Sequence, residues 1–159
     1  VNTNPYEGGS DHTPFLDNNI PGLLFWHFTD QFYHTDGDRL DKVSQETLKN
    51  VGIASLASAL TLINGDSYTA MDIVKIVRDA ATNRLSEEFL LSEKSIKSGN
   101  PAEIEIAILK AWEDWYLKAI ASTTDLASPD NTVILDKAIL EAQAIIESQA
   151  KMFAAELEK

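Results

Sequence analysis

Residues 20–28 read Ile-Pro-Gly-Leu-Leu-Phe-Trp-His-Phe, and this apolar run decides how the first part of the chain can fold. Its core, residues 23–28, is short and rich in aromatic side chains, which favours a buried strand over a helix. A strand that is apolar on both faces indicates a sheet covered on both sides. We therefore predict an α/β segment here. The run is shorter than the roughly 18 apolar residues of a membrane span, and no other run reaches that length, so we expect no span.

A short helix is expected before the strand, over residues 12–17. Ser10 or Asp11 can serve as its N-cap, because a side-chain oxygen at this position accepts a hydrogen bond from the first turn. Pro14 fits that first turn. Asn18-Asn19 can end the helix, because asparagine tolerates the left-handed conformation that helix ends often require.

From position 44 onward the sequence reads as helix upon helix. Ser44 is expected to cap a helix that runs to about position 63, and Thr69 with Asp72 forms a capping box for the next one. Two more helices follow the breaks at Gly99-Asn100-Pro101 and Ser128-Pro129-Asp130-Asn131. The apolar residues expected on the inner faces are Leu48, Val51, Leu56, Leu60 and Ile63; Ile73, Val74, Val77, Ala81, Leu85 and Phe89; Ile104, Ile108, Leu109, Trp112 and Trp115; and Ile134, Leu135, Ala138, Ala142, Ile145, Ile146, Met152, Phe153 and Leu157.

The chain is expected to divide near residues 64–66. Residues 1–65 contain the mixed α/β segment, and residues 66–159 contain helical patterns alone. The helical patterns after position 66 are expected to pack on one another as an antiparallel bundle. The predicted fold is therefore an α/β fragment followed by an all-α bundle, mostly helical overall.

The composition excludes several classes of function. The chain has 159 residues and a formal net charge of −12, from 25 acids and 13 bases. Nucleic-acid binding needs clustered lysine and arginine, so we expect no nucleic-acid partner. The absence of cysteine excludes disulfides, a thiol nucleophile and thiolate metal ligands.

His34 is the best candidate for a metal ligand. It follows the predicted strand in a polar loop, where open sheets often place their chemistry. Neutral imidazole is the usual nitrogen ligand of zinc, and Asp36 or Asp38 could accept a hydrogen bond from its second nitrogen. A catalytic zinc needs about three protein ligands, however, so His34 alone does not make a site.

Several motifs in the first part resemble a known family. They are Glu7-Gly8-Gly9-Ser10-Asp11-His12-Thr13-Pro14-Phe15-Leu16, Asn19-Ile20-Pro21, Tyr33-His34-Thr35 and Asp38-Arg39-Leu40-Asp41-Lys42-Val43. In this order and spacing they resemble the C-terminal signature of the co-catalytic zinc aminopeptidases. Relatives include bacterial leucyl aminopeptidases, glutamate carboxypeptidase, glutaminyl cyclases and the catalytically silent transferrin receptor. The resemblance covers about residues 6–63.

The resemblance implies roles for individual residues. His34 is similar to the last metal ligand, bound to one zinc of a pair, and Tyr33 to the residue whose hydroxyl steadies the tetrahedral oxyanion. Ser10, Asp11 and His12 resemble the helix start that shapes the floor of the pocket. The implied reaction is hydrolysis by a metal-bridging water, with zinc as Lewis acid. The implied substrate is a peptide that loses its N-terminal residue.

The resemblance also implies that this chain is incomplete. The other metal ligands and the general base of the family lie upstream of the signature. We therefore expect them on a missing N-terminal portion of the catalytic domain. Residues 1–65 of this chain would be the C-terminal portion of the same domain. The fragment alone is then expected to be inactive. One alternative is a non-catalytic scaffold or interaction module of the same fold. Another is a glutaminyl cyclase, which Leu24 and Tyr33 oppose because the cyclases carry histidine and tryptophan there. Relatives suggest a secreted or periplasmic location.

Overall fold

The computed structural model describes residues 10–25 and 30–159. By their internal contacts the residues form two compact units, Val1–Ala57 and Ser58–Lys159. The predicted division at residues 65/66 stays a prediction, because α2 (Gln45–Ile63) runs across the division that the contacts give. No helix among the described residues has the length and apolar character to cross a membrane.

The first unit contains the short helix α1 (Thr13–Leu16), the 3-10 turn η1 (Leu40–Lys42) and most of α2. The predicted helix at residues 12–17 is confirmed in its centre, with Pro14 in the first turn. Its N-cap is His12, and no side chain caps it, so the prediction that Ser10 or Asp11 would do so is wrong. Asn19 has a φ of 57°, the left-handed conformation expected of the residue that ends this helix.

The predicted buried strand is not found in the residues that the structure describes. Leu23, Leu24 and Phe25 have no regular secondary structure and are exposed, Leu23 by 85%. The rest of the predicted strand, residues 26–28, lies outside the described residues. A strand needs a neighbour that pairs with its N–H and C=O groups, and the described part of the chain contains no strand that could do so.

α2 begins where predicted, because the Thr47 N–H donates to the Ser44 hydroxyl at 3.2 Å. Its expected inner stripe is wrong as a buried face: α2 has no buried residue, and Ile63 is 79% exposed. After Lys49 the helix carries no charged side chain, so it is apolar on nearly all sides. Such a helix is typical of one enclosed by other elements, yet none of its residues is buried in the described part of the chain.

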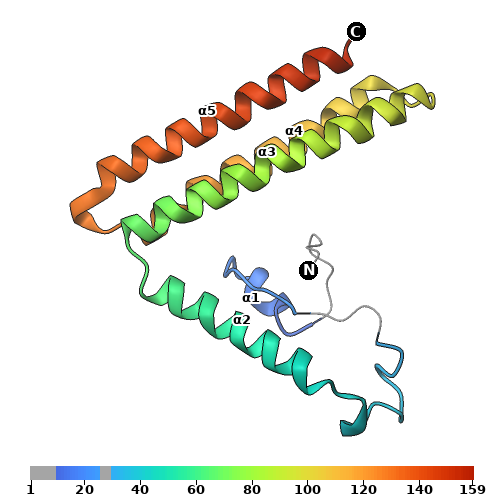
Figure 1. The fold of residues 1–159 in the computed structure, drawn as a ribbon, viewed down its shortest axis with the longest axis vertical. Coiled ribbons are helices and arrows are strands. Elements are labelled where there is room, and N and C mark those ends of the chain that lie inside the picture. The colour runs from blue at the N-terminus through green and yellow to red at the C-terminus, as the bar shows by residue number, and fades with distance from the viewer. Residues whose placement is uncertain (1–9, 26–29) are drawn as a thin grey trace. The chain divides into compact units, whose positions relative to one another are not determined.

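Three long helices make up most of the second unit. α3 (Ser67–Lys97), α4 (Ala102–Ala121) and α5 (Thr132–Leu157) lie side by side, and each contacts the other two. Short connections through η2 (Ser122–Leu126) and η3 (Pro129–Asn131) join α4 to α5, so successive helices run antiparallel (Figure 1). The predicted antiparallel bundle is confirmed. Its buried core consists of Ala70, Val74, Ala81, Leu85, Leu109, Ile120, Leu135, Ile139, Ala142, Ile146, Ala150 and Leu157.

The N-cap of α3 lies three residues earlier than predicted, at Asp66 instead of Thr69. The Asp66 carboxylate accepts hydrogen bonds from the Thr69 N–H at 2.8 Å and from the Thr69 hydroxyl at 3.0 Å. Asp66 is therefore the N-cap, and the expected capping box of Thr69 with Asp72 is wrong. Aspartate at this position satisfies backbone donors that have no partner within the helix.

The inner face of α4 differs from the predicted stripe. Leu109 is buried and Trp112 is partly buried, but Ile104, Ile108 and Trp115 are exposed. The helix instead turns Glu105 inward, where its carboxylate accepts a hydrogen bond from the Ser95 hydroxyl at 2.5 Å. A hydrophobic pattern cannot anticipate a buried glutamate, because its burial depends on that partner. In α5, likewise, Ile134, Ile145 and Met152 are exposed, and Ile139 and Ala150 are buried in their place.

One ion pair reinforces the bundle. Arg84 and Glu88 lie one turn apart on α3, with the guanidinium Nη2 2.6 Å from the buried Glu88 carboxylate. The Arg84 guanidinium also lies over the Trp112 ring of α4, 4.3 Å from its centroid. The arginine thus links α3 to α4 and supplies the partner that a buried carboxylate requires.

Candidate functional site

The turn that carries Tyr33 and His34 is built by local hydrogen bonds. The Asp30 carboxylate accepts from the Phe32 N–H at 2.9 Å, and the Thr35 hydroxyl donates to the Phe32 carbonyl at 2.6 Å. These are Asx and Ser/Thr turn interactions, which polar side chains make with nearby backbone. Asp30 and Thr35 therefore position the tyrosine and the histidine between them. The family motifs do not indicate this positioning role of Asp30 and Thr35. Aspartate and threonine at this spacing around a turn are the sequence signal for it.

The backbone at His34 is strained. Its φ is 61°, in the left-handed region that residues other than glycine seldom adopt, although histidine enters it more often than most. Such a conformation costs on the order of 1–3 kcal/mol and persists where the surroundings impose it, often at functional sites. The imidazole is exposed, so a ligand could reach it from solvent.

The two rings of the candidate site act as one unit. Tyr33 and His34 stack with their ring centroids 3.9 Å apart and their planes 18° apart. Tyr33 is 45% exposed, so its ring covers one face of the imidazole and still reaches solvent. Stacking limits the rotamers of both side chains. A ligand at the imidazole would therefore lie near the phenol.

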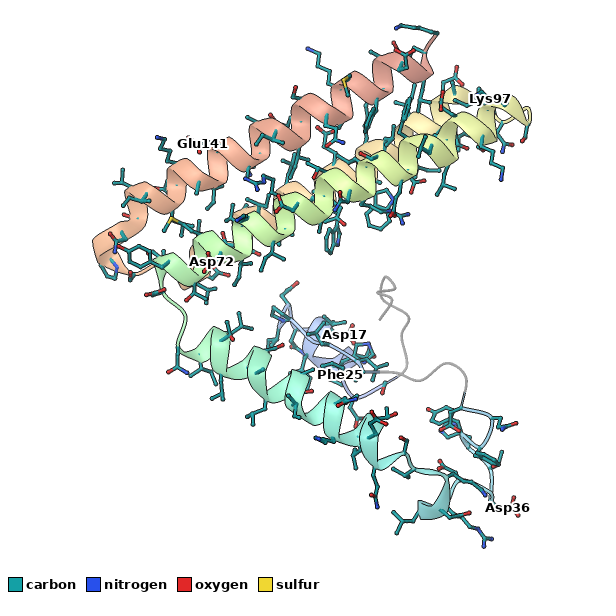
Figure 2. The ribbon with its side chains drawn as sticks, in the orientation of Figure 1. Asp17, Phe25, Asp36, Asp72, Lys97 and Glu141 are labelled. Carbon is teal, nitrogen blue, oxygen red and sulfur yellow. The ribbon has the colours of Figure 1, made fainter. Side chains whose placement is uncertain are left out.

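Asp36 and Asp38 are exposed and lie on the loop that follows. Figure 2 labels Asp36 on this loop. The Asp36 carbonyl accepts from Arg39 Nε at 2.9 Å, and the Asp38 N–H donates to the Thr35 carbonyl at 3.2 Å. In the described part of the chain neither carboxylate hydrogen-bonds to His34. The proposed orienting role of these two residues stays a prediction.

Ser10, Asp11 and His12 lie at the start of α1. The Ser10 carbonyl accepts from the Thr13 N–H at 2.9 Å, which closes the turn that opens the helix. His12 lies against Gly22, where a Cβ would be only 3.2 Å from the His12 Cβ. Glycine at this position allows the chain after α1 to pass close to the histidine. The three residues thus form one local structure, and their contribution to a pocket stays a prediction.

The described residues do not form a metal centre by themselves. No group of three histidine, aspartate or glutamate side chains within residues 10–25 and 30–159 is placed to hold a metal ion. His34 alone provides one ligand, whereas a catalytic zinc requires about three.

Comparison with known families bears on the same part of the chain. Residues 1–59 match the family model of Peptidase family M28. No curated protein and no solved structure matches the chain. The family match confirms the resemblance drawn from the motifs. It supports a metallopeptidase, because the peptidases of this family are generally zinc-dependent. It ends within α2 and leaves the three-helix bundle unassigned.

Proposed function

We propose that this chain is the C-terminal part of a zinc-dependent aminopeptidase with a two-zinc centre. The observation that carries the proposal is the coincidence of the family match over residues 1–59 with an exposed, strained imidazole at His34. His34 would be one zinc ligand. The remaining ligands and the general base would come from polypeptide outside this sequence, so the chain alone would be inactive.

Tyr33 would act next to that ligand. Its hydroxyl is a hydrogen-bond donor, and the stack on His34 holds it close to whatever the imidazole binds. A donor aimed at the oxyanion of a tetrahedral intermediate stabilises charge that develops only in the transition state. When bound, zinc would supply Lewis-acid polarisation of the scissile carbonyl and an activated water.

The test uses the full-length polypeptide and two variants of adjacent residues. His34→Ala should lower the zinc content and abolish hydrolysis of aminoacyl-anilide substrates. Tyr33→Phe keeps the stacked ring and removes only the hydroxyl, so zinc content should stay unchanged while kcat falls about 10²- to 10³-fold. If His34→Ala leaves both zinc content and hydrolysis intact, the ligand role is wrong. An unchanged kcat in Tyr33→Phe would remove the oxyanion role alone.

A second candidate function is a non-catalytic scaffold or interaction module. It is favoured by the bundle, because α3 to α5 lie outside the family match and carry exposed apolar residues such as Trp115 and Met152. The two functions are separated by the same assay. A full-length polypeptide that binds no zinc and hydrolyses no aminoacyl-anilide would support the scaffold.

A further inference from the structure

The turn between α2 and α3 contains Asn64 followed by Gly65, the one Asn-Gly pair in the sequence. α2 ends at Ile63, so both residues lie beyond its last helical position. Asn64 is exposed and Gly65 is half-buried. The pair matters because an asparagine side chain can react with the backbone nitrogen that follows it.

Local hydrogen bonds to the last turn of α2 close this turn, one of them from the Asn64 N–H to the Leu60 carbonyl at 3.1 Å. The Asn64 side-chain amide donates to the Leu60 carbonyl at 2.8 Å, and the Gly65 N–H donates to the Leu62 carbonyl at 3.2 Å. The side chains of Leu62 and Ile63 are exposed, and no residue of α2 is buried. Segments with few buried contacts and solvent-exposed backbone hydrogen bonds open locally at little cost. The last turn of α2 therefore opens readily enough to release both reacting groups.

We propose that Asn64 is a site of spontaneous deamidation. In the opened turn the Gly65 backbone nitrogen loses its proton and attacks Asn64 Cγ. The N–Cγ bond forms, the Cγ–Nδ2 bond breaks, and ammonia leaves with the proton, which gives a succinimide. Water then adds to either ring carbonyl and opens the ring to aspartate or to isoaspartate. Nothing is oxidised or reduced, and water is the only co-reactant.

Gly65 makes Asn64 the preferred asparagine. With no Cβ, the glycine offers the least steric resistance to ring closure. Asn100 is followed by Pro101, whose nitrogen carries no hydrogen, and Asn83 lies within the regular hydrogen bonds of α3. A larger residue would be crowded at this position, because a Cβ would lie 3.1 Å from Leu126 Cδ2 and 3.2 Å from the Leu62 carbonyl oxygen. The fold therefore favours glycine directly after Asn64.

The reaction would change the end of α2. A carboxylate at position 64 cannot donate to the Leu60 carbonyl, as the amide does. It would also lie at the helix C-terminus, where the macrodipole disfavours negative charge. Asp66 adds a second carboxylate two residues away. The modified turn should therefore lose its closing hydrogen bond and fray.

The test incubates the folded full chain at mildly alkaline pH and maps its peptides by mass spectrometry with isoaspartate detection. We expect a progressive loss of Asn64 with isoaspartate and aspartate as products, while Asn83 and Asn100 stay intact. Asn64→Gln leaves Gly65 and its packing untouched and should give no product at this position. If Asn64 survives in the folded chain while a short peptide with the same turn converts, the fold protects the amide and the proposal is overturned.

Discussion

Two adjacent isoleucines of α5 allow a sharp test of which face the bundle buries. Ile146 is fully buried in the core, whereas Ile145 is 45% exposed. Ile146→Ala removes buried methyl and methylene groups and leaves a cavity between the helices, which costs about 2–5 kcal/mol of unfolding free energy. Ile145→Ala removes a side chain that is half in water and encloses no cavity, so about 1 kcal/mol or less is expected.

The two variants control for each other. Both exchange the same residue types on the same helix, so the gain in helix propensity from alanine is common to both and cancels in the comparison. In a domain of about 100 residues 1 kcal/mol shifts the melting temperature by roughly 4–8 °C, so Ile146→Ala should melt about 10 °C or more below the parent chain. Circular dichroism at 222 nm during heating measures this. Equal shifts for the two variants would show that the inward face of α5 has been assigned incorrectly.

Two further predictions concern pH. Hydrogen bonds from the Thr69 N–H and hydroxyl lower the pKa of Asp66. The contribution of this cap to stability should therefore be present above about pH 4 and be lost as pH falls through the lowered pKa of the folded state. Asp66→Asn keeps a hydrogen-bond acceptor and should remove this acid sensitivity of the melting temperature. Burial, and next the Glu147 carboxylate, raise the pKa of Glu113, so its ionised form opposes folding at neutral pH. Glu113→Gln should therefore raise the melting temperature at neutral pH and have no effect in acid, where the parent side chain is protonated. A lower melting temperature of the variant at neutral pH would contradict this prediction.

The motifs predicted part of the candidate site. Their order and spacing were sufficient to identify the peptidase family, which the match over residues 1–59 confirms. They also pointed to Tyr33 and His34, which the structure stacks on each other. The left-handed backbone of His34 and the turn that holds it are results of local hydrogen bonding that no motif states. A metal centre needs donors from distant segments, and no run of adjacent residues can specify their convergence.

The strand prediction failed for a related reason. Residues 23–25 have strand-like composition, but a strand is stabilised by pairing with a neighbour rather than by its own sequence. The described residues contain no such neighbour, and these side chains are exposed. Helices differ because each closes its hydrogen bonds within its own segment.

Local sequence therefore determined the helices of this protein, their breaks and several of their ends. The cap at Ser44 and the left-handed turn at Asn19 follow from side chains and backbone within a few residues. Only the tertiary structure decided which face of each helix is buried. Glu105 is turned inward on α4 because Ser95 of α3 supplies its hydrogen bond, and Ile146 rather than Ile145 enters the core because α5 is rotated to fit its neighbours. Burial depends on partners that meet in space, and their positions are set by the packing of whole helices.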